Sequence, residues 1–171
     1  MLQDVVSVSL PVNERMRIKK NHFEPYNLTG KEKRICIVTG IHGDELEGQY
    51  VCYELIRRLG ENGHLLNGIV DIYPSMNPLG MDSIKREMPI FDLDMNMIFP
   101  GSETGAVAEH IAAAIMNDIK GADICIDIHA SNIFLREMLM YGREAQSKTR
   151  IASPATIPKS GERNRKIHSC M

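Results

Sequence analysis

Apolar residues along the chain alternate between strand-like and helix-like spacing, and this pattern predicts an α/β domain. Positions 35–38 form a continuous apolar run, which is typical of a strand buried on both faces. Apolar side chains then recur at helical spacing from Cys52 to Leu59, and Gly60 stands where helices commonly end. Positions 69–73 form the next apolar run. A strand, a helix and a strand in this order predict a parallel βαβ unit.

The segments on either side of this unit extend the predicted sheet. Two alternating segments around a turn predict an N-terminal β-hairpin over about residues 4–20. Residues 74–101 have no regular period and predict a long loop, which in a compact domain is usually functional. A second helix is predicted from an N-cap at Thr104 to Gly121, and alternation over residues 123–129 predicts another strand. We therefore expect a three-layer α/β domain with a mixed, mostly parallel sheet.

The apolar period disappears near residue 140, and the charge changes at the same place. Residues 141–171 hold seven Lys or Arg side chains against two Glu, whereas the whole chain has a net charge of −2. We expect residues 1–140 to form the domain and residues 141–171 to be a basic, poorly ordered tail. A chain of 171 residues can hold one domain with a substantial core, but two complete domains are not expected.

Composition argues against several classes of partner. The chain has no Trp, and its basic tail has no interleaved aromatic residues, so we expect no nucleic-acid partner. No apolar run approaches the ~18 residues needed to cross a bilayer, and Met1 is not followed by a secretory leader pattern, so we expect no membrane partner. The four Cys residues form no CxxC pair and indicate reduced thiols. We expect a cytoplasmic protein.

The polar loop Gly40–Gly48, directly after the first buried strand, carries the main chemical signal. His42 and Glu45 lie three residues apart, so an imidazole and a carboxylate can face one ion, and this donor pair suits zinc. His129 ends a later strand, at the sheet edge where ligands of open α/β sheets bind, and Asp127 shares its strand face and can orient its imidazole. From spacing alone, a polar loop plus a structural histidine is an equally good interpretation.

Several motifs in this order resemble those of the succinylglutamate desuccinylase/aspartoacylase family, a branch of the zinc carboxypeptidase-like fold. The resemblance runs from about residue 35 to 136, so we expect the tail at 141–171 to lie outside the family pattern. Several motifs in register are more specific than any one of them. The motifs are Gly-Ile-His-Gly-Asp-Glu at 40–45, Asn77-Pro78 followed by Arg86, Asp-Met-Asn-Met-Ile-Phe-Pro-Gly at 94–101, and Asp-Ile-His at 127–129.

This resemblance implies a zinc-dependent amidohydrolase that removes an N-acyl group from an amino acid or a related small amine. His42, Glu45 and His129 match the ligands of one Zn²⁺ per chain. Arg86 matches an arginine that stabilises the developing oxyanion, and Arg86 and Asn96 match substrate-binding residues. The fold implied is the N-terminal part of a zinc carboxypeptidase-like domain, incomplete at its C-terminus.

The sequence departs from the family pattern in two places. Met97 stands where the family motif has an arginine, so the bidentate grip on a substrate carboxylate is absent and a less acidic or differently anchored substrate is implied. Met97 itself is predicted to be a core residue rather than the lining of an apolar pocket.

The second departure concerns catalysis, because the general-base glutamate of the family falls beyond Met171. A catalytically impaired zinc-binding fragment, or pseudoenzyme, is therefore the alternative to an active hydrolase, and a carboxypeptidase acting on peptides is a more distant one. A truncated sheet would also expose an unpaired strand edge, from which a homo-oligomer is expected.

Overall fold

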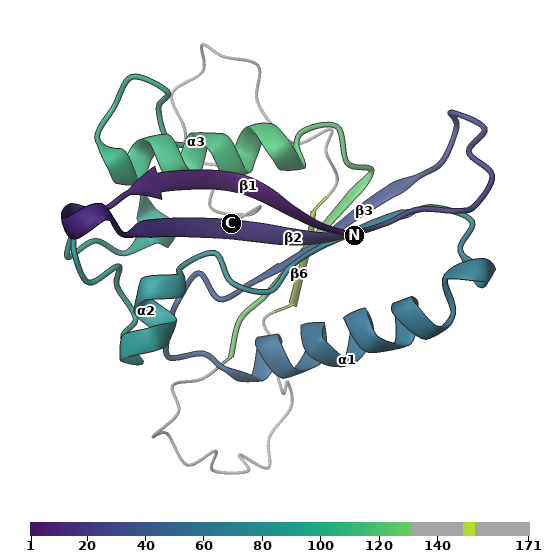
Figure 1. The fold of residues 1–171 in the computed structure, drawn as a ribbon, viewed down its shortest axis with the longest axis horizontal. Helices are drawn as coiled ribbons and strands as arrows, with labels where there is room; N and C mark the ends of the chain where they lie inside the picture. The colour runs from purple at the N-terminus through teal and green to yellow at the C-terminus, as the bar shows by residue number, and fades with distance from the viewer. Residues whose placement is uncertain (131–148, 153–171) are drawn as a thin grey trace.

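Six strands form one mixed sheet in the order β1-β2-β4-β3-β5-β6, between helices on its two faces (Figure 1). The computed structural model describes residues 1–130 and 149–152. The strands are β1 (Leu2–Ser9), β2 (Arg15–Phe23), β3 (Arg34–Thr39), β4 (Ile69–Tyr73), β5 (Ile124–Ile128) and β6 (Thr149–Ala152). The helices are α1 (Glu47–Glu61), α2 (Pro78–Ser83) and α3 (Val107–Ile119), with 3₁₀ turns η1 (Pro11–Asn13), η2 (Gly63–Leu65) and η3 (Met95–Met97).

Parallel pairing is confined to the three central strands, where β3 lies between β4 and β5. The N-terminal hairpin β1–β2 joins β4 antiparallel, and β6 joins β5 antiparallel. The sheet is therefore mixed, as predicted, but with a smaller share of parallel pairs than the sequence suggested. Because the central strands run the same way, the segments that follow β3, β4 and β5 meet at one edge of the sheet.

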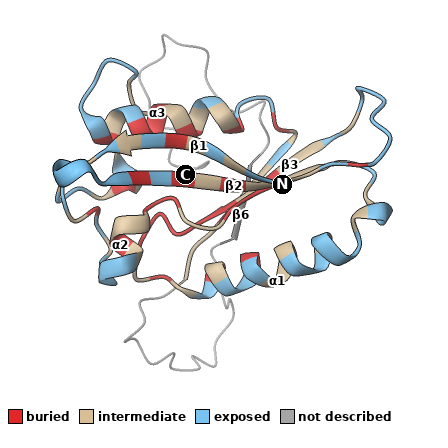
Figure 2. Cartoon of the chain, in the orientation of Figure 1, coloured by how far each residue is buried: buried red, intermediate tan, exposed pale blue. Residues whose placement is uncertain are grey.

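The core lies mainly between the sheet and α3. One face of α3 is buried, including Ile111 and Ile115, and it packs with Ile18 and Val38 of the sheet. Helix α1 covers the opposite face but buries only Gly48 and Cys52 fully. Figure 2 shows this difference, with buried positions along α3 and the central strands and a largely exposed outer surface on α1.

Residues 74–101, predicted as a loop, contain the short helix α2 and the turn η3. The Asn77 side chain caps α2, because its Oδ1 accepts a hydrogen bond from the Gly80 backbone N–H at 2.9 Å. Pro78 occupies the first helical turn, where its missing N–H costs nothing. A helix of six residues is too short for an apolar period to be recognised, so α2 was not predicted from the sequence.

Two helix ends differ from the sequence predictions by a few residues. Helix α1 continues through Gly60 to Glu61, and the Asn62 N–H bonds to the Arg58 carbonyl at 3.0 Å. Helix α3 begins after Ala106 rather than at Thr104, because the Glu109 carboxylate reaches back to the Ala106 N–H at 2.8 Å. Gly121, with a φ of +86°, follows the end of α3 as predicted.

Strand β6 lies inside the segment predicted as a poorly ordered tail. The rest of that predicted tail falls outside the described residues. Within the described part of the chain, no helix is both long and apolar enough to span a membrane.

Candidate metal centre

The loop between β3 and α1 is held in place by a close backbone contact with α2. A Cβ atom added at Gly43 would lie 2.0 Å from the Gly80 carbonyl carbon, so only glycine fits there. The Gly43 N–H also donates to the Lys85 carbonyl at 3.0 Å. This contact fixes the loop that carries His42 and Glu45, both of which are buried.

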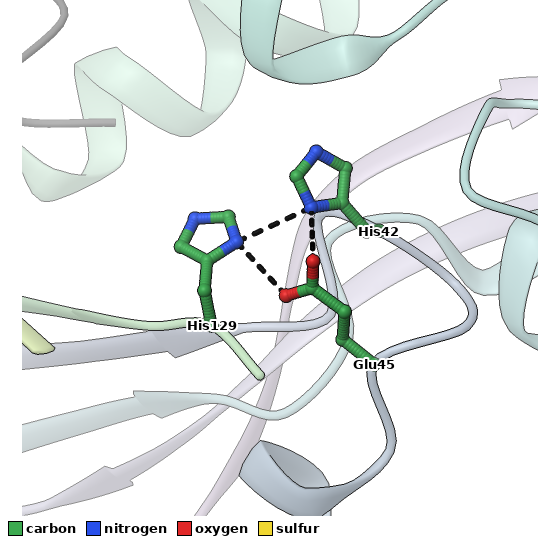
Figure 3. Close-up of side chains that lie close together, drawn as sticks. All are labelled: His42, Glu45 and His129. Carbon is green, nitrogen blue, oxygen red and sulfur yellow. Dashed lines mark hydrogen bonds and ion pairs between the residues drawn. The ribbon is translucent and has the colours of Figure 1, made fainter. Parts of the chain in front are cut away.

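The structure brings the three predicted ligands together (Figure 3). His42 Nδ1 lies 2.8 Å from Glu45 Oε1, and His129 Nδ1 lies 3.0 Å from Glu45 Oε2. The two Nδ1 atoms are 3.2 Å apart, and one donor atom from each of the three residues lies within 4.8 Å of the others. Glu45 Oε2 also accepts the Ala130 N–H at 2.9 Å, which ties its carboxylate to the end of β5.

Each imidazole has an outer carboxylate partner. His129 Nε2 lies 3.0 Å from Asp127 Oδ2, in line with the predicted role of Asp127, and His42 Nε2 lies 3.3 Å from Asp94 Oδ1. A carboxylate at this position favours the tautomer with the proton on Nε2, which leaves the Nδ1 lone pair facing the centre. The partnership of His42 with Asp94 was not identified from the sequence, although Asp94 opens one of the motifs quoted above.

The pKa shifts of Glu45 and His129 indicate that the space between the potential ligand atoms favours a positive charge. Burial raises the pKa of Glu45, but hydrogen bonds with His129 and His42 lower it more, so its pKa lies far below the usual value. Hydrogen bonds to the carboxylates of Asp127 and then Glu45 raise the pKa of His129 to about 9. Two imidazole nitrogens and a carboxylate that converge in a buried site are the donor set zinc prefers, so these residues fit a zinc ion.

Arg86 lies at the border of this cluster. Its Nη2 is 3.2 Å from Asp94 Oδ2, and its Nη1 is 3.7 Å from Glu45 Oε1. Its side chain is 41% exposed, so the guanidinium is both anchored and open to solvent. That position suits a group that meets a substrate beside the metal.

Asn96 and Met97 follow in η3, one turn from Asp94. The Asn96 N–H donates to Asp94 Oδ1 at 2.9 Å, and its side-chain Oδ1 is buried without a hydrogen-bond partner among the described residues. Met97 is 68% exposed, so the prediction of a core residue is wrong. The 3₁₀ turn buries the preceding Met95 instead and leaves Met97 on the outside.

The profile of the succinylglutamate desuccinylase/aspartoacylase catalytic domain matches residues 31–153, and so extends past residue 140 into the predicted tail. An N-alpha-acetyl-L-2,4-diaminobutyric acid deacetylase from Halomonas elongata is 30% identical over 102 residues, which are 59% of this chain and 29% of the relative.

The fold of the chain is also similar to the folds of solved structures. A succinylglutamate desuccinylase/aspartoacylase from Rhodobacter sphaeroides is 26% identical, with a TM-score of 0.66 over 77% of this chain and 40% of that one. A metallo-carboxypeptidase from Burkholderia cenocepacia shares the fold at 17% identity, with a TM-score of 0.61 over 77% of this chain and 36% of that one. The chain thus spans less than half the length of these relatives.

A catalytic-domain profile that covers most of the chain agrees with the carboxypeptidase-like fold and with the grouping of His42, Glu45 and His129 at one sheet edge. The chain therefore belongs to the succinylglutamate desuccinylase/aspartoacylase family.

Proposed function

We propose that this protein is a zinc-dependent amidohydrolase that removes an N-acyl group from an amino acid or a related small amine. The observation that carries the proposal is the convergence of the buried His42 and Glu45 with the half-buried His129, with the Arg86 guanidinium at its border. The name of the Halomonas elongata relative, a deacetylase of an N-acetylated amino acid, supports the same reaction class.

His42 and His129 would hold the ion through Nδ1, and Glu45 through its carboxylate. A zinc ion held in this way polarises a carbonyl group and lowers the pKa of water to about 7. Asp94 and Asp127 would keep the proton of each imidazole on Nε2, so that both Nδ1 atoms would be available to the ion. The five side chains would thus act as one preorganised site.

Arg86 would bind the substrate and stabilise negative charge that develops on the scissile carbonyl oxygen. Its guanidinium is fixed by Asp94 yet partly exposed, and a preorganised donor of this kind contributes most where charge appears in the transition state. Asn96 would position the substrate with its side-chain amide. The small-molecule partner that we propose is an N-acyl amino acid or amine. We further propose that the protein is cytoplasmic and forms a homo-oligomer. It would bind neither nucleic acid nor membranes.

The second candidate function is zinc binding without turnover. The converging residues His42, Glu45 and His129 can hold an ion whether or not hydrolysis follows. The two functions share every residue of the metal centre and differ only in hydrolysis.

Metal content and hydrolysis, measured on the same preparation, test both functions. We expect one zinc per chain, lost in His42→Ala and His129→Ala but kept in the control His64→Ala, since His64 is exposed and outside the cluster. Chelator-sensitive hydrolysis of N-acetyl amino acids would establish the hydrolase. Stoichiometric zinc without hydrolysis would favour the second function, and absence of zinc would overturn both.

A further inference from the structure

Cys36 of β3 and Cys125 of β5 lie opposite each other in the sheet. They are direct partners in the register of these two parallel strands, although 89 positions separate them in sequence. Both side chains lie on the face of the sheet that α3 covers, because Cys36 belongs to the buried core on that face and Cys125 packs against it. Both are thiols in the structure. Two sulfur atoms are therefore neighbours across this pair of strands.

The spacing of the two strands permits a disulfide bond between these thiols. Neighbouring strands lie about 4.8 Å apart, within the roughly 4.4–6.8 Å that separates the Cα atoms of disulfide-bonded cysteines. The Cβ atoms of such a pair must approach to about 3.5–4.5 Å, which is closer than the strand spacing. The bond would therefore be strained, and strained disulfides are reduced more easily than relaxed ones. A bond at this position would form under oxidising conditions and break again under reducing ones.

The two thiols differ in their access to solvent. Cys36 is fully buried, whereas Cys125 is half-buried. Burial raises the pKa of the Cys36 thiol to about 11, so its reactive thiolate form is scarce at neutral pH. An oxidant in solution therefore meets Cys125 first, and Cys36 reacts with a sulfur atom that the neighbouring strand holds beside it.

The strands that carry these cysteines also lead to the proposed metal ligands. Strand β3 runs into the loop with His42 and Glu45, and β5 ends directly before His129. The loop and the end of β5 meet at the Glu45 carboxylate, which accepts the Ala130 N–H and contacts His129 Nδ1. A covalent bond between β3 and β5 would therefore hold the two halves of the metal centre together.

We infer that Cys36 and Cys125 form a reversible disulfide bond that links the two ligand-bearing strands, with a small-molecule disulfide as the oxidant. The Cys125 sulfur attacks one sulfur of the oxidant and displaces the first thiolate. The Cys36 sulfur then attacks the Cys125 sulfur of this mixed disulfide and displaces the second thiolate. The protein thiols lose two electrons and two protons, and the oxidant takes them up as two small-molecule thiols. The inference requires neither zinc nor hydrolysis, so it goes beyond the proposed function and does not depend on it.

Oxidation of the folded full chain with oxidised glutathione, followed by alkylation of the remaining thiols and peptide mass mapping, tests the inference. Digestion with trypsin and a glutamate-specific protease separates Cys36 from Cys52, because Glu45 and Glu47 lie between them. The matched control is Cys52, which is equally buried and whose pKa burial also raises to about 11, but which lies in α1 on the opposite face of the sheet. The unmodified chain, Cys125→Ala and Cys52→Ala are melted before and after oxidation.

We expect a cross-linked peptide pair that contains Cys36 and Cys125 and that is lighter by two hydrogen atoms than the reduced peptides together. Excess reduced glutathione should reopen the bond, because it is strained. Oxidation should raise the melting temperature by about 5 °C or more in the unmodified chain and in Cys52→Ala, but not in Cys125→Ala.

The inference is overturned if Cys36 stays open to alkylation after unfolding of the oxidised chain, or if either cysteine pairs with a different cysteine instead. A bond that forms only in urea, where the strands are apart, would overturn it as well. A bond that reduced glutathione does not reopen, or that leaves the melting temperature unchanged, would contradict a reversible link between the strands. None of these results depends on zinc content, so each would leave the proposed function standing.

Discussion

At the residue scale, Asp94 connects three residues of the site without being one of the proposed ligands. Its Oδ1 faces His42 Nε2 and also accepts the Asn96 N–H, while its Oδ2 faces the Arg86 guanidinium. One carboxylate therefore orients a proposed ligand, the proposed oxyanion-binding group and the turn that carries Asn96. Only the bond to Asn96 lies within the motif at 94–101, whereas His42 and Arg86 lie outside it. The spacing of residues within the motif therefore did not predict the contacts with His42 and Arg86.

Asp94→Asn should weaken zinc binding by about 10- to 100-fold, the usual effect of losing an outer partner of a metal-binding histidine. The amide N–H of asparagine can face His42 Nε2, which would move the imidazole proton to Nδ1, the nitrogen that faces the centre. Competition with a calibrated chelator measures the affinity. The control is Asp92→Asn, on the same segment, where a φ of +50° is well tolerated by asparagine. Equal zinc affinities in the two variants would show that Asp94 does not set the tautomer of His42.

At the scale of elements, the contact between the β3–α1 loop and α2 determines where two of the three proposed ligands lie. Gly43 lies against the Gly80 backbone, and the two segments are 37 positions apart in sequence. The helical period correctly predicted α1, but it said nothing about α2 or about this contact. The geometry of the site thus depends on a short helix that the sequence pattern did not predict.

Gly43→Ala should lower the free energy of unfolding by about 1–3 kcal/mol, because its Cβ would collide with backbone that cannot rotate away. Zinc occupancy should fall as well, since the loop must shift to relieve the collision. The comparison is Gly60→Ala in α1, where nothing lies within 4 Å of the added Cβ and stability should rise by about 0.5–1 kcal/mol. Urea unfolding and metal analysis of both variants check this, and unchanged stability in Gly43→Ala would contradict it.

At the scale of the whole molecule, a buried charge network centred on Asp71 joins the hairpin, the central strands and α3. Asp71 of β4 accepts hydrogen bonds from Arg34 Nε at 2.8 Å and Lys20 Nζ at 3.4 Å, and its Oδ1 lies 2.6 Å from His22 Nδ1. Lys20 Nζ also lies 2.9 Å from Asp118 Oδ2 of α3. Replacing the central carboxylate would leave the part-buried Arg34 guanidinium without its carboxylate partner and the buried Lys20 ammonium with Asp118 alone, which is strongly destabilising.

Asp71→Asn should therefore lower the free energy of unfolding by about 3–5 kcal/mol at pH 7, whereas the exposed Asp82→Asn should change it little. Burial raises the pKa of Asp71, but hydrogen bonds from His22 and Arg34 lower it more, so the folded-state pKa lies below the usual 3.8. A depressed carboxyl pKa stabilises the fold above that usual value, and the contribution is lost as the pH falls below 3.8 through the folded-state pKa. Urea unfolding across this pH range should show a smaller acid loss in Asp71→Asn than in the unmodified chain, and identical pH profiles would contradict the role of Asp71.

The sequence by itself determined the positions of the central strands, α1 and α3, and the identity of the three proposed ligands. The elements follow from periodicity, which is a property of neighbouring residues. For the ligands, spacing left a structural alternative open, and the resemblance of several motifs to one family singled them out. His42 and Glu45 are three positions apart. His129 stands at the carboxyl end of a predicted strand, which is where open α/β sheets bind their ligands, so it could be considered as a ligand without coordinates.

Only the tertiary structure decided the outer partner of His42, the exposure of Met97, the Asp71 network and the antiparallel share of the sheet. Each of these depends on which segments, distant in sequence, become neighbours, or on which side of a short turn faces the core. His42 and Asp94 are 52 positions apart, and Lys20 and Asp118 are 98 apart. Contacts of this kind arise when the whole sheet and its helices pack together, so no local pattern of apolar and polar residues can specify them.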